Sequence, residues 1–312
     1  MMDLTDKSQL IGYLKSHGLY TKKSLGQNFL IDKNVLAEII KAGELKPTDT
    51  VVEIGPGLGT LTNELLKHCK KVIAVEKDEK LAEILKLNIT HTDFIHRKDT
   101  DNGKYESRNP KSLPSRQAGG TNIINDDILN INPNELTANS YKLIANIPYY
   151  ITSKILRHFL ESENKPELIV MMTQKEVAER ICAKPGDMSL LSVSVQYYGE
   201  PEIIKTVKAE SFFPKPEVES AILRIASRKY KVESIKGIEE EYFFKIVRAG
   251  FMARRKTLLN NLKTGTELQR DEILDIMKRI GLKENARAQE LSINKWGQIC
   301  QEIQKINKTI RK

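Results

Sequence analysis

Three glycines and one acidic residue form the first group able to hold a ligand. Gly55, Gly57 and Gly59 alternate directly after a short apolar run, and Glu76 ends the next apolar run, 21 residues after Gly55. Glycine permits a tight turn and lets a ligand approach the backbone, and an acid at this distance can accept both hydroxyls of a ribose. The pattern predicts a site for a cofactor that contains adenosine. The alternative is a tight turn followed by a surface acid.

Charge near this loop helps to distinguish two classes of cofactor. The spacing fits NAD and S-adenosylmethionine equally well. Glu53 lies just before the loop, where a carboxylate would repel a pyrophosphate but not a cationic sulfonium. Asp127 follows a third apolar run and could accept a hydrogen bond from an adenine amino group, with Asp126 as its alternative. An isolated Asp at such a place is as often a helix or turn cap.

The second group is Asn146-Ile147-Pro148-Tyr149, which follows a fourth apolar run. The exocyclic amine of adenine is a poor nucleophile, because its lone pair is delocalised into the ring. The Asn146 side-chain carbonyl and a backbone carbonyl at Ile147 or Pro148 could accept its two N–H bonds and direct the lone pair toward a methyl donor. Pro148 stiffens the turn, and Tyr149 offers a face for a stacked base. This chemistry needs no metal, and the alternative is a strand-end turn with a packed aromatic ring.

Alternating strands and helices must position these groups. Asp32 can cap a helix over 33–42, and Asp78 can cap another after Glu76. The glycine loop opens a further helix over 60–69. We expect strands at 50–54, 71–75, 122–125, 141–145, 168–172, 203–207 and 220–225. This order predicts an α/β fold, in which helices cover both faces of a mostly parallel sheet.

Two stretches depart from this alternation. Residues 89–121 are polar and carry six Lys and Arg against four Asp and Glu, so we interpret them as an inserted surface loop. After Ser227 the pattern becomes helical, at roughly 239–262, 267–280 and 286–306. We therefore expect one domain over 1–226 and a small all-α domain over 227–312.

Charge divides the chain in the same way. The 312 residues carry a net charge of +9, and residues 227–312 hold 20 Lys and Arg against 11 Asp and Glu, so the first 226 residues are neutral overall. This division suggests catalysis in the larger part and polyanion binding in the smaller one, with a lysine-rich solvated surface as the alternative. No stretch approaches the ~18 apolar residues of a membrane span, no secretory signal is visible, and the three cysteines lie far apart, so we expect a cytoplasmic protein.

Four motifs together resemble those of the rRNA adenine N6,N6-dimethyltransferase family. They are Ser24-Leu25-Gly26-Gln27-Asn28-Phe29-Leu30, Glu53-Ile54-Gly55-Pro56-Gly57-Leu58-Gly59-Thr60-Leu61-Thr62, Asn146-Ile147-Pro148-Tyr149-Tyr150-Ile151-Thr152 and Phe212-Phe213-Pro214-Lys215-Pro216-Glu217-Val218-Glu219-Ser220. The resemblance covers nearly the whole chain from about residue 20. It implies a Rossmann-like S-adenosylmethionine-dependent methyltransferase domain, with a mostly parallel seven-stranded sheet whose seventh strand is antiparallel, and then a small helical domain. It also implies dimethylation of two adjacent adenosines in a hairpin loop near the 3′ end of small-subunit (16S) rRNA.

The resemblance also implies roles for individual residues. Gln27, Asn28 and Leu30 would form part of the wall of the S-adenosyl-L-methionine site. Gly55 and Gly57 would contact the methionine end, Glu76 the ribose and Asp127 the adenine. Asn146 would touch the cofactor at the point of methyl transfer. Next to them, Pro148 would shape the catalytic turn, and the rings of Tyr149 and Phe212 would hold the target base between them. For Phe212, a core aromatic before a proline-rich turn is the alternative.

A basic cluster lies in the helix expected over 239–262. It consists of Arg248, Arg254, Arg255 and Lys256. The apolar residues of this helix would form a buried stripe, so that the charges point outward and can contact phosphates, which fixes position rather than sequence. The family resemblance agrees and implies that this domain docks on the small ribosomal subunit precursor. We expect a monomer, and a solvated helix face is the alternative for the cluster.

Three other functions fit part of the sequence. A large-subunit rRNA adenine methyltransferase of the macrolide-resistance type shares these motifs. The longer basic helical tail and the sequence Gly57-Leu58-Gly59-Thr60-Leu61-Thr62 favour the small-subunit branch of the family instead. A non-catalytic RNA-binding assembly factor could keep the cofactor fold, but the intact motif from Asn146 to Tyr149 argues against a loss of activity. An NAD dehydrogenase is a more distant alternative.

Overall fold

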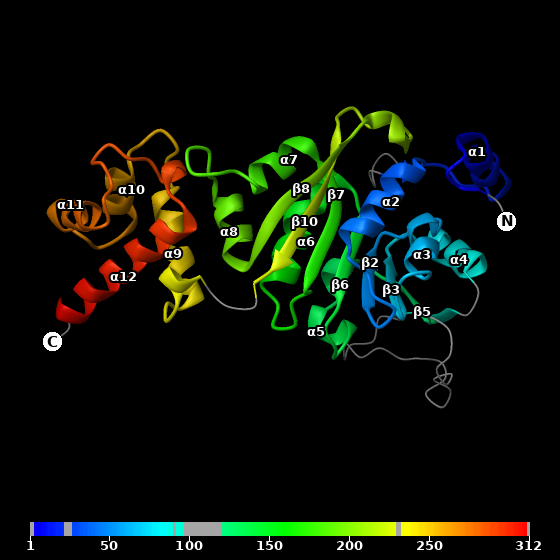
Figure 1. Cartoon of the computed structure of the whole chain (residues 1–312), viewed down its shortest axis with the longest axis horizontal. Helices are drawn as coiled ribbons and strands as arrows, with labels where there is room; N and C mark the ends of the chain where they lie inside the picture. The colour runs from blue at the N-terminus through cyan, green and yellow to red at the C-terminus, as the bar shows by residue number, and fades with distance from the viewer. Residues whose placement is uncertain (1–2, 22–26, 90–91, 97–119, 229–231, 311–312) are drawn as a thin grey trace. The chain divides into compact units, whose positions relative to one another are not determined.

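The computed structural model describes residues 3–21, 27–89, 92–96, 120–228 and 232–310. The chain divides into a sheet unit, Met1–Ala178 with Glu202–Ser227, and a helical unit, Glu179–Pro201 with Arg228–Lys312 (Figure 1). The expected domains differ from these units by Ser227, which belongs to the sheet unit, and by the segment Glu179–Pro201, which belongs to the helical unit. Its helix α8 (Leu190–Tyr198) packs the ring of Tyr197 against that of Phe243, with ring centroids 4.8 Å apart, and this contact explains the second difference.

The sheet has eight strands among the described residues, in the order β4-β5-β3-β2-β6-β7-β10-β8. The strands are β2 (Thr50–Ile54), β3 (Lys71–Glu76), β4 (Thr92–His96), β5 (Gly120–Asn125), β6 (Lys142–Asn146), β7 (Leu168–Gln174), β8 (Gly199–Val207) and β10 (Ser220–Ser227). Neighbours from β4 to β7 run parallel, whereas β10 pairs antiparallel with β7. The predicted α/β fold with a mostly parallel sheet is confirmed.

Strand β4 adds an eighth strand to the seven that we expected. It lies inside the segment 89–121, and it pairs in parallel with β5 at the sheet edge, with Phe94 opposite Ile123. The interpretation of this whole segment as a loop is therefore wrong for Thr92–His96. The polar composition of the segment as a whole conceals the short apolar pair Phe94 and Ile95, which suits a strand. Gly120 and Thr121, the last two residues of the expected insertion, begin β5, and residues 90–91 and 97–119 lie outside the described residues.

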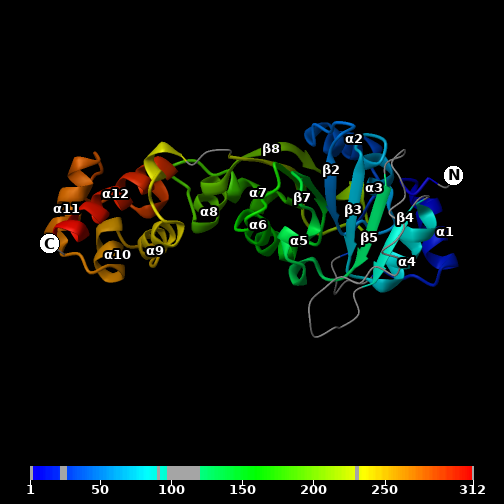
Figure 2. The same cartoon turned by 90° about the horizontal axis from the view of Figure 1, so that it is seen from below.

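Helices cover the sheet on both faces. Helices α2 (Lys33–Ala42), α3 (Thr60–Leu65) and α4 (Glu79–Asn88) share one buried apolar cluster with the strands. Helix α6 (Thr152–Leu160) buries its apolar residues outside that cluster, on the opposite side of the sheet (Figure 2). Both aspartate caps form as predicted: Asp32 accepts the N–H groups of residues 34 and 35, and Asp78 those of residues 80 and 81.

A second, two-stranded sheet joins the first and last sequence motifs. Strand β1 (Phe29–Leu30) pairs antiparallel with β9 (Phe212–Phe213), so that Leu30 lies opposite Phe212. The N-terminal helix α1 (Lys7–Ser16) also packs beside β1, because its buried Leu10 and Leu14 belong to a small apolar cluster that Phe29 contacts. This pairing brings residues 27–30 to the edge of the main sheet.

In the helical unit, the continuous helix expected over 239–262 is wrong. Two helices replace it, α9 (Glu240–Gly250) and α10 (Leu258–Gly265), followed by α11 (Arg270–Arg279) and α12 (Ile293–Ile310). Gly250 ends α9 where the chain passes very close to Trp296: a Cβ atom on Gly250 would lie 2.2 Å from the Cη2 atom of that ring. Glycine at this position therefore serves tertiary packing, which a helical pattern in the sequence cannot reveal.

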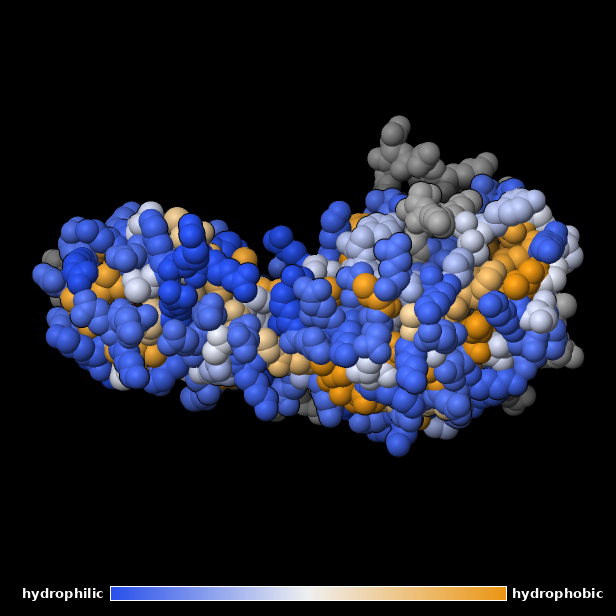
Figure 3. Space-filling model, turned by 90° about the horizontal axis from the view of Figure 1, so that it is seen from above, coloured by the Kyte–Doolittle hydropathy of each residue, from blue (hydrophilic) through white to orange (hydrophobic). Residues whose placement is uncertain are grey.

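The face of the molecule drawn in Figure 3 is mainly polar. On the face drawn in Figure 3, hydrophilic residues predominate and hydrophobic ones form small, separate groups. None of the described helices is long and apolar enough to span a membrane. The exposed large hydrophobic side chains come from separate segments: Tyr20, Leu87, Tyr150, Leu190, Val218 and Met252.

Candidate active site

The glycine loop turns at the carboxyl end of β2. Gly55, Gly57 and Gly59 have positive φ angles of 67°, 58° and 89°, which other residues rarely adopt. A Cβ atom on Gly57 would lie only 3.3 Å from the Cε1 atom of Phe29. The loop therefore needs glycine for its turn and for its close packing, and it presents bare backbone to the space beside it.

Glu76 lies next to this loop because β2 and β3 are parallel neighbours, with Ile54 opposite Val75. Its carboxylate accepts hydrogen bonds from the backbone N–H groups of Gly57 (3.0 Å) and Asp78 (2.9 Å). Glu76 is buried, and this burial raises the pKa of its carboxyl above the ordinary value. One side chain thus links the glycine loop to the start of α4.

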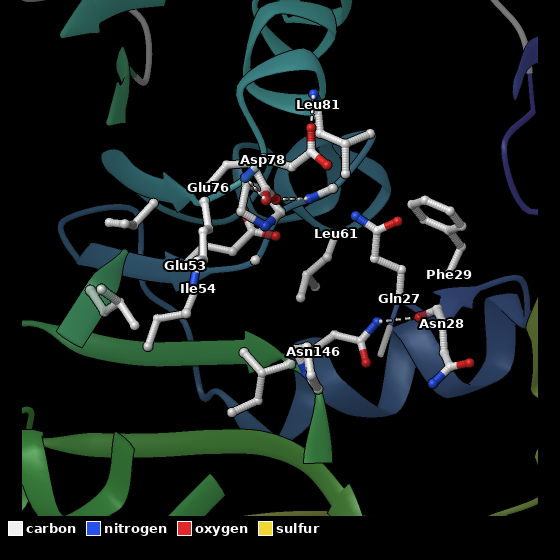
Figure 4. Close-up of a pocket in the computed structure, with 18 of the residues that line it drawn as sticks. Gln27, Asn28, Phe29, Glu53, Ile54, Leu61, Glu76, Asp78, Leu81 and Asn146 are labelled. Carbon is white, nitrogen blue, oxygen red and sulfur yellow. Dashed lines mark hydrogen bonds between the residues drawn. The ribbon is translucent and has the colours of Figure 1, made fainter. Parts of the chain in front are cut away.

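A cavity that is partly open to solvent lies at the carboxyl ends of β2, β3, β5 and β6 (Figure 4). Open α/β sheets place their ligand sites at this edge. Most of the predicted site residues line the cavity together: Gln27, Asn28, Leu30, Gly55, Gly57, Glu76, Asp127, Asn146, Pro148 and Tyr149. Ser24 to Gly26 of the first motif lie outside the described residues.

Asn146 ends β6 and reaches across the cavity toward the β1 segment. Its Nδ2 atom donates a hydrogen bond to the backbone carbonyl of Asn28 at 3.5 Å (Figure 4). Among the described residues, no donor is bonded to the Asn146 Oδ1 atom. The carboxamide is therefore oriented through its nitrogen, and its oxygen remains able to accept a hydrogen bond from a ligand.

Tyr149 follows Asn146 at the mouth of the cavity and is held from two sides. Its hydroxyl shares a hydrogen bond of 2.5 Å with that of Ser220 on β10, and its backbone carbonyl accepts one from the Thr152 hydroxyl at 3.0 Å. The half-buried ring also packs against the core cluster of the sheet. Tyr149 is thus a fixed aromatic surface, as a stacking residue requires.

Glu53 lies at the end of β2 and lines the same cavity. It is 1% exposed, and neither carboxylate oxygen has a hydrogen-bond partner among the described residues. Burial, and to a smaller extent the Glu76 carboxylate, raises the pKa of Glu53 to about 8, although the neighbouring Thr62 hydroxyl acts in the opposite direction. A buried carboxyl group without a partner is costly unless a ligand satisfies it, and a cationic ligand would do so. The site therefore fits the sulfonium and ammonium groups of S-adenosylmethionine better than a pyrophosphate.

Asp127 lies across the cavity at the end of β5. Its Oδ1 atom accepts the backbone N–H of Leu129 at 3.0 Å, and its Oδ2 atom forms an ion pair with the Lys77 ammonium at 2.9 Å. Burial of Asp127 opposes its ionisation, but these two donors outweigh the burial and lower the pKa of its carboxyl. Asp127 therefore presents a charged acceptor at the rim, and it also caps the short turn after β5.

Phe212 is the exception among the predicted residues in the sheet unit. The structure buries it, at 3% exposed, in the core cluster with Leu30 and Met172, and its ring does not line the cavity. The stacking of Phe212 on the target base stays a prediction, and so does its alternative, a core aromatic before a proline-rich turn.

The cavity also contains residues that sequence reasoning missed. Lys77 and Asp78 line it directly after Glu76, and Tyr150, which is 63% exposed, lines it directly after Tyr149. The signal was available in each case, since the next one or two residues after a strand end also reach the carboxyl edge of a parallel sheet. Which of these neighbouring side chains line the cavity, and how exposed they are, can be seen only in the folded structure.

The basic cluster is distributed differently from the prediction. Arg248 lies in the last turn of α9, whereas Arg254, Arg255 and Lys256 lie in the turn between α9 and α10. All four side chains are exposed, and none of them forms an ion pair with another described residue. Cations without a carboxylate partner remain able to bind an external anion.

Comparison with known proteins decides between the candidate families. Residues 18–305 match the family model described as ribosomal RNA adenine dimethylase. The chain belongs to this family. It is accordingly an S-adenosylmethionine-dependent rRNA adenine dimethyltransferase, and its cavity carries the acceptors and the glycine loop that such a cofactor requires.

Individual relatives of this dimethyltransferase support the assignment. The chain is 43% identical over 289 residues to the ribosomal RNA small subunit methyltransferase A of Dehalococcoides mccartyi, with 92% of this chain and 90% of the relative covered. It is 36% identical to the protein of the same name from Bacillus cytotoxicus, with 96% and 97% covered. Among solved structures, the 23S rRNA methyltransferase ErmE matches with a TM-score of 0.68 at 26% identity, covering 89% of this chain and 100% of ErmE.

Proposed function

We propose that this dimethyltransferase acts on small-subunit rRNA, where it dimethylates N6 of two adjacent adenosines in a hairpin loop near the 3′ end of 16S rRNA. Its partner would be the small ribosomal subunit precursor, and it would work as a cytoplasmic monomer in small-subunit biogenesis. The observation that carries the proposed chemistry is the Asn146 carboxamide, which is anchored through its nitrogen and presents its oxygen at the cavity. The choice of subunit is supported by the names of the relatives at 36% to 43% identity.

The cavity offers a place for each part of S-adenosylmethionine, which when bound supplies a methyl group on a sulfonium. Glu76 would accept the ribose hydroxyls, and Asp127 the adenine amino group. Gly55 and Gly57 would lie along the methionine end, near the unpartnered carboxyl of Glu53. The side of the site would be closed by the β1 segment, through Gln27, Asn28 and Leu30.

The target adenine would be positioned at the Asn146 end of the cavity. The Asn146 oxygen accepts one N6–H bond and the backbone carbonyl of Ile147 or Pro148 accepts the other, so that the nitrogen lone pair points into the cavity. The Tyr149 ring stacks on the base. The amine becomes acidic only when it gains the methyl group, and it can then lose a proton to water, so no dedicated base is required.

The basic cluster would provide the contact with the ribosomal subunit. Arg248, Arg254, Arg255 and Lys256 are exposed and without ion pairs among the described residues, which suits phosphate binding. Phosphate contacts position a protein but carry no sequence information. The shape of folded rRNA would therefore supply most of the specificity.

A 23S rRNA target is the second candidate, and the similarity to ErmE favours it. The decisive experiment incubates the protein and labelled S-adenosylmethionine with undermethylated small subunits or with undermethylated large subunits, and then locates dimethyladenosine by mass spectrometry of each rRNA. We expect N6,N6-dimethyladenosine at two adjacent positions near the 3′ end of 16S rRNA alone. Label in 23S rRNA alone would overturn the proposed target, and no label in either would overturn the proposed activity on intact subunits.

A further inference from the structure

The turn between α9 and α10 carries three consecutive cations, Arg254, Arg255 and Lys256. Like charges at neighbouring positions repel one another, and an unrestrained turn would let them spread apart. A turn that must meet a phosphate surface gains affinity when its shape is fixed before binding, because less conformational freedom is then lost. A residue that fixes the shape of this turn can therefore affect binding through that shape.

Asn261, in the first half of α10, fixes the turn from inside the helical unit. It is 2% exposed, and its Nδ2 atom donates two hydrogen bonds, to the backbone carbonyls of Gly250 at 2.7 Å and of Ala253 at 3.0 Å. The Gly250 carbonyl is among the last of α9, where no further helical N–H is available to it. The Ala253 carbonyl also accepts the N–H of Lys256 at 3.0 Å.

These contacts connect one buried carboxamide of α10 to two backbone carbonyls that precede the basic segment, at the end of α9 and directly before Arg254. The Gly250 bond sets the point at which α9 stops, and the Ala253 bond sets the backbone just before Arg254. The surroundings leave little room for adjustment, because Gly250 packs on Trp296 and Leu258 is completely buried. If the donor were removed, a buried carbonyl would lose a partner and the turn would relax.

We propose that Asn261 is a positioning residue for ribosome docking: it holds the turn of residues 254–256 in the one shape that presents the three cations together to rRNA phosphates. The inference rests on the proposed docking role of this cluster. It assigns to Asn261 an effect on subunit binding that is separate from its contribution to stability.

The test uses the full-length protein with Asn261→Leu, which keeps a side chain of similar size but has no donor. The matched control is Asn260→Leu, since Asn260 is its exposed neighbour on the same helix. Binding to undermethylated small subunits is measured across a salt titration, well below the melting temperature of each variant. Affinity for S-adenosylmethionine, whose cavity lies in the sheet unit, shows that this unit is intact. If Asn261→Leu does not fold, Asn261→Ser, which retains one donor, takes its place.

We expect Asn261→Leu to weaken subunit binding several-fold and to leave the affinity for S-adenosylmethionine unchanged. The slope of the binding constant against salt concentration should decrease by the amount that corresponds to about one to two phosphate contacts. When Asn261→Leu is combined with Arg254→Gln/Arg255→Gln, the loss of affinity should be smaller than the sum of the two separate losses, because both changes remove the same contacts. A folded Asn261 variant with unchanged affinity and salt dependence, or with fully additive effects, would overturn the positioning role. Unchanged binding of Arg254→Gln/Arg255→Gln would instead overturn the docking role of the cluster.

Discussion

The Asn146 carboxamide donates its N–H to the backbone carbonyl of Asn28, across 118 residues of sequence. The bond spans from the end of β6 to the start of β1, and it determines which atom of the side chain faces the cavity. Because the nitrogen is engaged, the oxygen is the atom presented to a substrate amine. This orientation underlies the proposed catalysis and gives it a direct test.

Asn146→Ala should abolish most methyl transfer while leaving binding of the ribosomal subunit largely intact. Without the Asn146 oxygen, the target amine loses an acceptor in the transition state, which we expect to cost at least about a hundredfold in kcat. Single-turnover transfer of labelled methyl groups to undermethylated small subunits measures this, with Asn139→Ala, on an exposed loop, as control. Equal rates for Asn146→Ala and the wild type would refute the role.

Glu76→Gln should weaken S-adenosylmethionine binding by roughly ten- to a hundredfold, because a charged acceptor for the ribose hydroxyls becomes a neutral amide. The two carboxylate oxygens accept the N–H groups of Gly57 and Asp78, and in glutamine one of these oxygens is replaced by a nitrogen that cannot accept a hydrogen bond. Isothermal titration calorimetry checks the affinity, and Glu79→Gln, three residues further and exposed, serves as control. An affinity equal to that of the wild type would show that Glu76 is only a structural link between the loop and α4.

Tyr149→Ala should reduce kcat/KM by about ten- to a hundredfold, because it removes the ring on which the base stacks. Tyr149→Phe keeps the ring but removes the hydrogen bond to Ser220, so we expect activity within a few-fold of the wild type and a lower melting temperature. The two variants are compared by steady-state kinetics and thermal unfolding. If Tyr149→Phe lost as much activity as Tyr149→Ala, the hydroxyl rather than the ring face would be the important group.

Glu53 should make the stability of the sheet unit depend on pH. The unfolded carboxyl loses its proton near its ordinary pKa of 4.5, whereas burial raises the pKa of the folded one to about 8. Between these values the folded chain binds more protons, so stability falls as pH rises and levels off above about pH 8. Glu53→Gln should remove this fall and raise the melting temperature near pH 8 in the absence of cofactor. Melting curves from pH 5 to 8.5 test this, with Glu83→Gln on the surface of α4 as control; parallel curves for all three proteins would contradict it.

Reversal of two charges, Arg254→Glu/Arg255→Glu, should weaken binding to the small subunit and make it less sensitive to salt, because fewer counterions are released from phosphates. Lys41→Glu/Lys46→Glu changes the net charge equally but on exposed positions of the sheet unit. Filter binding over a salt titration compares the two variants. Equal losses would indicate that net charge, rather than the turn between α9 and α10, governs the association.

Most of the cavity could be predicted from the sequence, because its residues sit at places defined by local pattern. Apolar runs identify parallel strands, and whatever follows such a run must lie at the carboxyl edge of the sheet, as Glu76 and Asn146 do. The alternating glycines permitted a tight turn at this place, and the structure gives all three of them positive φ angles. These predictions needed only the periodicity of the chain and the geometry of a parallel sheet.

Other features were decided by contacts between distant segments. The β1–β9 pairing and the burial of Phe212 depend on which side chains meet in the core, and the break after α9 depends on the approach of Gly250 to Trp296. The isolation of the Glu53 carboxylate is likewise visible only once its neighbours are known. The sequence by itself determined the order of the elements and the residue types at the sheet edge. Tertiary structure decided which of those side chains are exposed to a ligand, because burial is a property of the packed chain and not of any local segment.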